Sequence, residues 1–238
     1  MQDIFERYEK KYLITEKQRD ALHEVLANHM VPDQYSDYLV QNLYYDTERW
    51  DVIRTSIEKP AYKEKMRLRC YGETDGDSLC YLELKKKYKG VVYKRRIAIP
   101  AQSLVNGSVR SIVSAAPSQI AKELCFYLQS NDVSKKIYIS YQRIAFAGKE
   151  AAGLRVTFDT DIRFRLHDLN FAHSNDGQRI LPTGYMLMEV KVLGGMPLWL
   201  AGALSINGIF PTAFSKYGSC YTEYIVRKKE ERMVKISA

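Results

Sequence analysis

Hydrophobic and polar residues alternate along most of this chain, which is the pattern of β-strands with one buried face. The alternation predicts strands near residues 5–14, 39–45, 62–71, 79–88, 91–99, 137–147, 153–163 and 185–193. Only Lys89 and Gly90 separate the fourth and fifth of these, so that pair should form a β-hairpin. The pattern therefore predicts a protein built mainly on antiparallel strands.

Four segments show helical spacing instead. The clearest begins at Thr15-Glu-Lys-Gln18, a capping box that is followed by apolar residues at helical intervals. The four expected helices cover residues 15–29, 46–59, 117–131 and, at the C-terminal end, 215–233. Because strands predominate, the predicted fold class is all-β dominated α+β, with the helices as decoration.

One long uncharged segment has the length of a membrane span. The 24 positions from Val192 to Ser215 would be long enough to span a bilayer. However, glycines and prolines interrupt the segment, and Asn207 lies well inside it. A buried helix of about three turns that begins at Pro197 fits better, so we expect no membrane span.

The remaining composition favours a soluble, cytoplasmic protein. The first residues are charged from Asp3 onward, so no secretory signal is expected there. The four cysteines lie far apart and form no C-x-x-C motif, which argues against a disulfide scaffold or a zinc knuckle. No obligate protein partner is evident, and residues 1–238 should form a single domain.

Charge is distributed in an unusual way over the predicted strands. Alternate residues of a strand share one face, and in five strands that face is charged while the other is mainly apolar. Eleven cations lie in or beside these rows: Arg7, Lys11, Lys65, Arg67, Arg69, Lys85, Lys87, Arg143, Arg155, Lys191 and Lys216. Four carboxylates accompany them: Glu9, Glu83, Asp159 and Glu189.

A solvated sheet face is the simplest explanation of charged rows. Rows of like charge repel one another, however, and these cations carry most of the net charge of +8. Closing the sheet into a barrel would point the rows at a shared polyanion across a lumen and leave the apolar faces beneath the helices. The few carboxylates would suit a divalent metal that takes its other oxygens from phosphate.

Eight motifs in order resemble those of the VTC (vacuolar transporter chaperone) polyphosphate-polymerase domain, a triphosphate tunnel metalloenzyme related to the CYTH proteins. Their positions are 7–14, 43–47, 67–72, 82–85, 141–146, 155–161, 188–192 and 215–217. The resemblance implies an eight-stranded antiparallel tunnel β-barrel with a charged lumen and several helices. The first motif reads Arg7-x-Glu9-x-Lys11 where CYTH proteins have Glu-x-Glu-x-Lys, which favours the VTC branch.

The resemblance also implies roles for the charged residues. Catalytic contacts to phosphate would come from Lys11, Arg67, Arg69, Lys85, Arg143 and Lys216. Further substrate contacts would come from Arg7, Lys65, Lys87, Arg155, Lys191, Ser215 and Tyr217. Mg²⁺ or Mn²⁺ would be held mainly by Glu189, with Glu9 and Glu83 as weaker candidates.

The predicted function is metal-dependent phosphoryl transfer on triphosphates, and the favoured hypothesis is polyphosphate synthesis from ATP. Hydrolysis of a triphosphate and non-catalytic binding of polyphosphate remain alternatives, because the same cations would serve all three. A binder of single-stranded nucleic acid would need aromatic residues beside the cations. Tyr71 and Tyr81 share those faces, but lysine and arginine dominate them, so no nucleic acid partner is expected.

Overall fold

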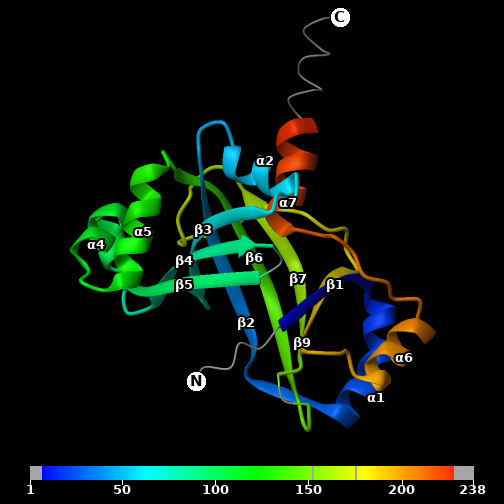
Figure 1. Cartoon of the computed structure of the whole chain (residues 1–238). Coiled ribbons are helices and arrows are strands. Elements are labelled where there is room, and N and C mark those ends of the chain that lie inside the picture. Colours follow the sequence, from blue (N-terminus) through cyan, green and yellow to red (C-terminus); the bar gives the residue numbers. More distant parts are fainter. Residues whose placement is uncertain (1–6, 90, 152, 175, 228–238) are drawn as a thin grey trace, which may run out of the picture. The chain divides into compact units, whose positions relative to one another are not determined.

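The computed structural model describes residues 7–89, 91–151, 153–174 and 176–227 (Figure 1). The strands are β1 (Arg7–Thr15), β2 (Met30–Asp46), β3 (Tyr62–Tyr71), β4 (Leu79–Tyr88), β5 (Val91–Pro100), β6 (Ser134–Gly148), β7 (Arg155–Arg165), β8 (Gln178–Arg179) and β9 (Tyr185–Leu193). The helices are α1 (Glu16–His29), α2 (Asp51–Ile57), α3 (Ser103–Asn106), α4 (Val109–Ala115), α5 (Gln119–Ser130), α6 (Leu198–Ile206), α7 (Lys216–Ser219) and a π-helix, η1 (Cys220–Val226). Antiparallel strands dominate, which confirms the predicted fold class.

The chain divides into two compact units. The first unit comprises Met1–Tyr38, Tyr141–Ile162 and Arg179–Lys216, and the second comprises Leu39–Ser140, Arg163–Gln178 and Tyr217–Ala238. In the first unit the strand order is β1-β9-β7-β6-β2, and in the second it is β6-β2-β3-β4-β5. Four strands, β2, β6, β7 and β8, contribute residues to both units, so the single domain predicted from the sequence stays a prediction.

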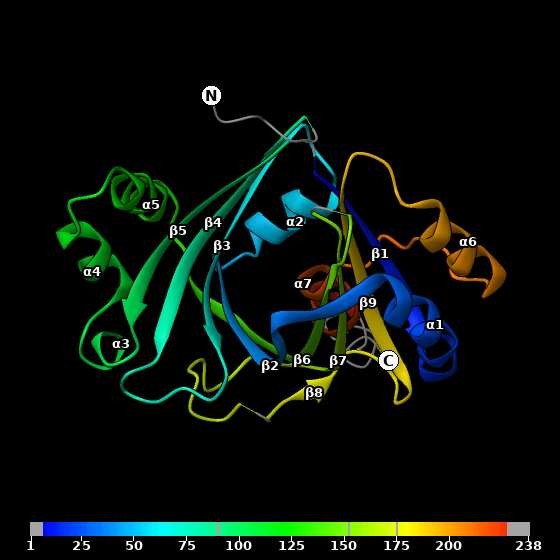
Figure 2. The ribbon, with the colours of Figure 1, turned by 90° about the horizontal axis from the view of Figure 1, so that it is seen from below.

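The core of the first unit lies between the sheet and two helices. Apolar residues of β1, β7 and β9 pack with Leu22 and Leu26 of α1 and with Leu200 and Leu204 of α6. Figure 2 shows α1 and α6 side by side next to β1 and β9. The capping box predicted at Thr15 and Gln18 is present at the start of α1. One face of these strands therefore packs in the core, and the charged face lies outside it.

The core of the second unit follows the same rule. Met66, Leu68, Leu82 and Leu84 of β3 and β4 pack against Val113, Leu124 and Leu128 of α4 and α5. In Figure 2, α3, α4 and α5 lie beyond β5. The sequence predicted α5 but neither α3 nor α4, because helices this short show too few turns for a clear period.

Among the residues that the structure describes, the strands do not close into a hydrogen-bonded ring, because β1 and β5 are the two ends of the strand order. The free edge of β1 is covered by the chain after α6, where Tyr12 forms a bridge with Pro211 and Thr212 N–H donates to the carbonyl of Lys11 at 2.7 Å. Proline cannot continue a ladder of hydrogen bonds, so this contact ends the pairing.

Element boundaries agree with the sequence pattern for most elements, and five differ. β8 was not predicted, and α2 begins at Asp51 instead of Asp46, which ends β2. β2 is 17 residues long, and its first part was not predicted because it shows little apolar alternation. The tight turn contains Gly90, which lies outside the described residues, although Tyr88 pairs with Val91 as a hairpin requires. The C-terminal helix is observed to Arg227, and the rest of its predicted length also lies outside them.

The uncharged segment folds nearly as expected. α6 begins directly after Pro197 and buries Leu200, Ala203 and Leu204. Its other side is not buried, since Leu198 is 89% exposed and Ile206 is 86% exposed. In the part of the chain that the structure describes, no helix is long and apolar enough to cross a membrane.

Candidate functional site

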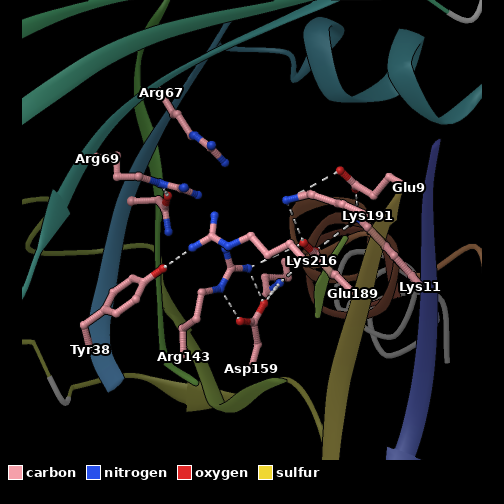
Figure 3. Close-up of polar contacts among 12 residues, drawn as sticks. Glu9, Lys11, Tyr38, Arg67, Arg69, Arg143, Asp159, Glu189, Lys191 and Lys216 are labelled. Carbon is pink, nitrogen blue, oxygen red and sulfur yellow. Dashed lines mark hydrogen bonds and ion pairs between the residues drawn. The ribbon is translucent and has the colours of Figure 1, made fainter. Parts of the chain in front are cut away.

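Strand register brings opposite charges together in the first unit. Lys11 of β1 pairs with Glu189 of β9, and Glu9 pairs with Lys191. Because paired residues of an antiparallel ladder share a face, the four side chains lie next to one another (Figure 3). With Arg143 of β6, Asp159 of β7 and Lys216 of α7 they form what we call the Glu189 cluster.

Asp159 is the buried anchor of this cluster. Its carboxylate is fully buried and accepts a forked pair of hydrogen bonds from Arg143, with Nε 2.6 Å from Oδ1 and Nη2 2.8 Å from Oδ2. Lys216 Nζ lies 2.5 Å from Oδ2. Both cations also lie over the ring of Tyr141, at 5.1 Å for Arg143 and 4.4 Å for Lys216. These contacts fix the positions of two cations that the sequence placed at the site.

Glu189 is surrounded differently. Lys11, Arg143, Lys191 and Lys216 all lie 3.5–3.7 Å from its oxygens, beyond the 2.7–3.2 Å typical of a hydrogen bond. The residue is 7% exposed. Glu189 is therefore a buried anion surrounded by four cations, and its ion-pair distances to them are longer than a hydrogen bond.

The cluster shifts the pKa values of its members. Burial alone would raise the pKa of Glu189, but Lys216, Lys11, Arg143 and Lys191 together hold it well below the ordinary value. Burial would lower the pKa of Lys216, yet Asp159 and Glu189 raise it to about 12. At Lys191 burial prevails over the neighbouring carboxylates and lowers the pKa. Glu189 is thus ionised at neutral pH, and Lys216 keeps its charge.

Two carboxylates of the cluster, Glu9 and Glu189, lie beside the same pair of lysines. Glu9 lies 3.8 Å from both Lys11 and Lys191, the same two lysines that border Glu189. Within the described residues, no group of three or more His, Cys, Asp and Glu side chains is arranged to hold a metal ion. Two carboxylates do suit a hard cation such as Mg²⁺, which commonly takes its other ligands from water and substrate phosphates.

The second unit carries a separate row of cations. Register places Lys63, Lys65, Arg67 and Arg69 of β3 beside Lys85 and Lys87 of β4 and Lys94 and Arg96 of β5. We call this row the β3–β5 cationic face. Crowding shows in the pKa of Lys63, which is lowered by burial and then by Lys87, Lys59 and Lys85. Such a face would be stabilised by a bound polyanion.

One carboxylate, Glu83, lies within this face and forms ion pairs with two cations. Arg67 Nε and Nη2 lie 2.8 and 2.7 Å from Oε2, and Lys94 Nζ lies 2.6 Å from Oε1. Burial opposes ionisation of Glu83, but the neighbouring cations, Arg67 and Arg69 first, lower its pKa to about 2. Both oxygens are held at hydrogen-bond distance, so the geometry favours a counter-ion over the metal ligand considered from the sequence.

The buried Asn42 and the partly buried Tyr44 orient the arginines of the cationic face. Asn42 accepts from Arg69 Nε at 2.8 Å and donates to the carbonyl of Ile139 at 3.0 Å, which fixes its amide. Arg67 Nη1 donates to the hydroxyl of Tyr44 at 3.2 Å. Burial would raise the pKa of Tyr44, yet Arg67, Arg69 and Lys65 together lower it, which reflects a positive local potential.

Tyr217 is a structural residue rather than an exposed contact. It is 2% exposed, its ring stacks on Tyr44 at 4.7 Å, and its hydroxyl donates to Asp46 at 2.6 Å. The same carboxylate accepts the backbone N–H groups of Val52 and Ile53 at the start of α2. A phosphate contact from Tyr217 therefore has little support.

The other expected substrate contacts lie in varied surroundings. Lys85 and Lys87 are exposed, and Lys65 lies 5.8 Å above the ring of Tyr217. Arg155 pairs with Asp33 at 2.8 Å and donates to the hydroxyl of Tyr38 at 3.4 Å. Arg7 opens β1, but its side chain lies outside the described part of the chain. Ser215 belongs to the first unit and directly precedes Lys216, the first residue of α7.

Sequence reasoning did not assign two residues that shape the sites. Asp159 stands in a charged row, but nothing in a one-dimensional pattern separates a buried anchor from a ligand. Asn42 lies on a strand next to apolar residues, where a buried amide leaves no periodic signal. Its pairing with Arg69 across β2 and β3 becomes visible only in the register.

Comparison with known proteins agrees with this fold. The family model of the VTC domain matches residues 6–224, and the chain belongs to that family. Among the curated proteins there is no significant match.

Three solved structures are similar to this chain at low sequence identity. A Hippeastrum protein, described as a candidate adenylyl cyclase with a dominant triphosphatase activity, is 17% identical. The match covers 89% of this chain and 93% of that one, with a TM-score of 0.53. A candidate adenylate cyclase from Vibrio parahaemolyticus is 11% identical, with 92% and 98% covered and a TM-score of 0.49. A Pyrococcus horikoshii protein is 14% identical, with 94% and 98% covered and a TM-score of 0.47.

Proposed function

We propose that this protein catalyses metal-dependent phosphoryl transfer on a triphosphate, with ATP as donor and a growing polyphosphate chain as acceptor. The observation that carries the proposal is the contrast among the carboxylates. Asp159 and Glu83 accept short hydrogen bonds from cations, whereas Glu189 and Glu9 have ion-pair distances of 3.5–3.8 Å. A carboxylate that serves as a structural counter-ion accepts short hydrogen bonds from its cations. A carboxylate that serves as a metal ligand needs oxygens that are not already held by such bonds.

The cations would bind and orient the phosphates. Arg67 and Arg69 lie two residues apart on β3, so both guanidinium groups can reach one phosphate cluster. Lys11, Arg143 and Lys216 border Glu189 and would contact the phosphoryl group that is transferred. Since Arg143 and Lys216 are held by Asp159, they need little reorganisation as charge develops in the transition state.

Glu189 and Glu9 would hold Mg²⁺ or Mn²⁺ together with phosphate oxygens. Such an ion supplies charge neutralisation at the transferred group and at the leaving diphosphate. The long distances around Glu189 leave its oxygens for this task. Asp159 accepts hydrogen bonds from Arg143 and Lys216 and would therefore take no part in binding the metal.

The nature of the acceptor separates the proposed polymerase from a triphosphatase. A phosphate oxygen as acceptor extends a chain and releases ADP, whereas water releases free phosphate. The triphosphatase activity described for the Hippeastrum protein makes hydrolysis the second candidate. Membership of the VTC family favours synthesis.

One assay distinguishes these outcomes. The full chain is incubated with ATP and Mn²⁺, and polyphosphate chains, ADP and free phosphate are resolved over time. Chains together with one ADP for each phosphate residue incorporated support the polymerase, and equal amounts of free phosphate and ADP support the hydrolase. Tight binding of tripolyphosphate with no product in either Mn²⁺ or Mg²⁺ would reduce the protein to a receptor and refute the enzymatic proposal.

A further inference from the structure

The cationic face of the second unit ends in two tyrosines that phosphate binding does not explain. Tyr71 follows Arg69 at the next same-face position of β3, and Tyr81 pairs with Arg69 across the ladder to β4. Same-face positions along a strand are about 6.6–6.8 Å apart. Two aromatic rings therefore adjoin the arginine that begins the row of cations.

The rings and two guanidinium groups form a compact arrangement. The ring centroids of Tyr71 and Tyr81 are 5.9 Å apart at an interplanar angle of 64°. The guanidinium of Arg96 lies 4.4 Å above the ring of Tyr81, and that of Arg69 lies 5.8 Å above the ring of Tyr71. At this end of the face each tyrosine ring thus has one arginine over it, and the two rings meet edge to face. Tyrosine rings and arginine guanidinium groups are the side chains on which flat, polarisable groups stack.

These tyrosines are not part of the core. Their neighbours Cys70 and Cys80 are fully buried in the second unit, as strand alternation requires. Tyr71 is 37% exposed and Tyr81 is half-buried on the charged face. An aromatic pair that served only packing would gain most by complete burial, so the retained exposure suggests a ligand.

We propose that Tyr71, Tyr81 and Arg96 form a stacking platform for the base of a nucleoside triphosphate. The proposal deepens the proposed function and rests on it, because the phosphates must lie along the row that begins at Arg69. The ribose of a nucleotide separates its base from the first phosphate by a distance comparable to one same-face step of a strand. Stacking uses the π-face that every base presents, so all four common nucleotides should bind, purines somewhat more tightly.

The test compares ATP with ribose 5-triphosphate, which has the same phosphates and sugar but no base. Affinities are measured by calorimetry for the full-length wild-type chain and for the double variant Tyr71→Leu/Tyr81→Leu. Tyr93→Leu is the matched control, because Tyr93 is a 49% exposed tyrosine on the opposite face of β5. Thermal unfolding of each variant confirms that it folds.

We expect the wild type and the Tyr93 control to bind ATP about tenfold or more tightly than ribose 5-triphosphate, within the range of base–aromatic stacking. The double variant should bind both ligands equally, with ribose 5-triphosphate unaffected. Equal affinities in the wild type, or equal losses for both ligands in the double variant, would overturn the platform. Failure of both ligands to bind the wild type would instead refute the proposed function itself.

A further arm tests a different occupant. A short single-stranded oligonucleotide without a triphosphate is titrated into the same three proteins. Weak binding that the double variant does not change agrees with a nucleotide platform. Binding tighter than that of ATP, lost in the double variant, would overturn the proposal in favour of a nucleic acid surface.

Discussion

The Glu189 cluster of the first unit has three carboxylates among four cations, whereas the β3–β5 cationic face has one carboxylate among eight cations. The cluster is also more buried, since Asp159, Glu189, Arg143 and Lys216 are each at most 9% exposed. On the cationic face, Lys85, Lys87, Lys94 and Arg96 are exposed.

This difference teaches how one sheet architecture can divide two tasks. A cation-rich, accessible face attracts a polyanion but does not determine what happens to it. A balanced, buried cluster holds its groups in fixed positions, which is what transition-state stabilisation requires. We therefore expect changes in the Glu189 cluster to affect turnover, and changes in the cationic face to affect binding and stability.

The largest effect is expected for Glu189→Gln. A hard cation binds a carboxylate far better than a neutral amide, so the variant should lose turnover by about a thousandfold or more. Tripolyphosphate should still bind, because the cations remain. The measurement is single-turnover phosphate transfer across a Mn²⁺ titration, with binding measured by calorimetry. Near-normal turnover in the variant would make Glu189 a counter-ion and remove the contrast between the two regions.

The next effect concerns the single carboxylate of the cationic face. The pKa of Glu83 is about 2 in the folded protein, below its ordinary value of 4.5, so the unfolded chain binds protons more readily. The stability that Glu83 contributes is therefore complete above about pH 5 and is lost as the pH falls toward 2, on the order of 3 kcal/mol. Urea unfolding of the wild type and of Glu83→Gln over this window should show a smaller pH dependence in the variant. Parallel curves would mean that Arg67 and Lys94 do not depress the pKa.

The comparison also shows what the sequence could and could not predict. The two-residue period of a strand places Lys63, Lys65, Arg67 and Arg69 on one face. The cationic face could therefore be predicted from the sequence. The sequence could not show which carboxylate is a metal ligand and which is a counter-ion. Glu83 and Glu189 have the same sequence context, because each lies in a charged row beside apolar neighbours. Distances of 2.6–2.8 Å at one and 3.5–3.7 Å at the other come from side-chain packing.

The fold itself was predicted with similar limits. Strands with clear alternation were placed within about two residues, as β3, β4 and β9 show. The first part of β2 was missed, because its burial pattern follows no period of two. Tyr217 was expected to contact substrate from its motif, and its bond to Asp46 could be found only in three dimensions.

A smaller effect is expected for Arg69→Ala on the cationic face. Loss of one forked guanidinium should weaken triphosphate binding by about 1.5–3 kcal/mol, the range for hydrogen bonds to charged groups. Arg95→Ala is the matched control, since Arg95 lies on the opposite face of β5 and pairs with Glu123. Calorimetry with tripolyphosphate should show the loss only for Arg69→Ala. An equal change in both variants would indicate a general effect of net charge rather than a site.

The smallest effect is expected for Asn42→Leu, which tests whether orientation matters as well as charge. The variant keeps every cation of the face but removes the acceptor that holds Arg69 Nε at 2.8 Å. Triphosphate affinity should fall about three- to tenfold, which corresponds to the ~0.5–1.5 kcal/mol of an ordinary hydrogen bond. A double-mutant cycle with Arg69→Ala separates this role from a structural one, because Asn42→Leu should cost little once Arg69 is absent. Full additivity in that cycle would show that Asn42 acts on the fold and not through Arg69.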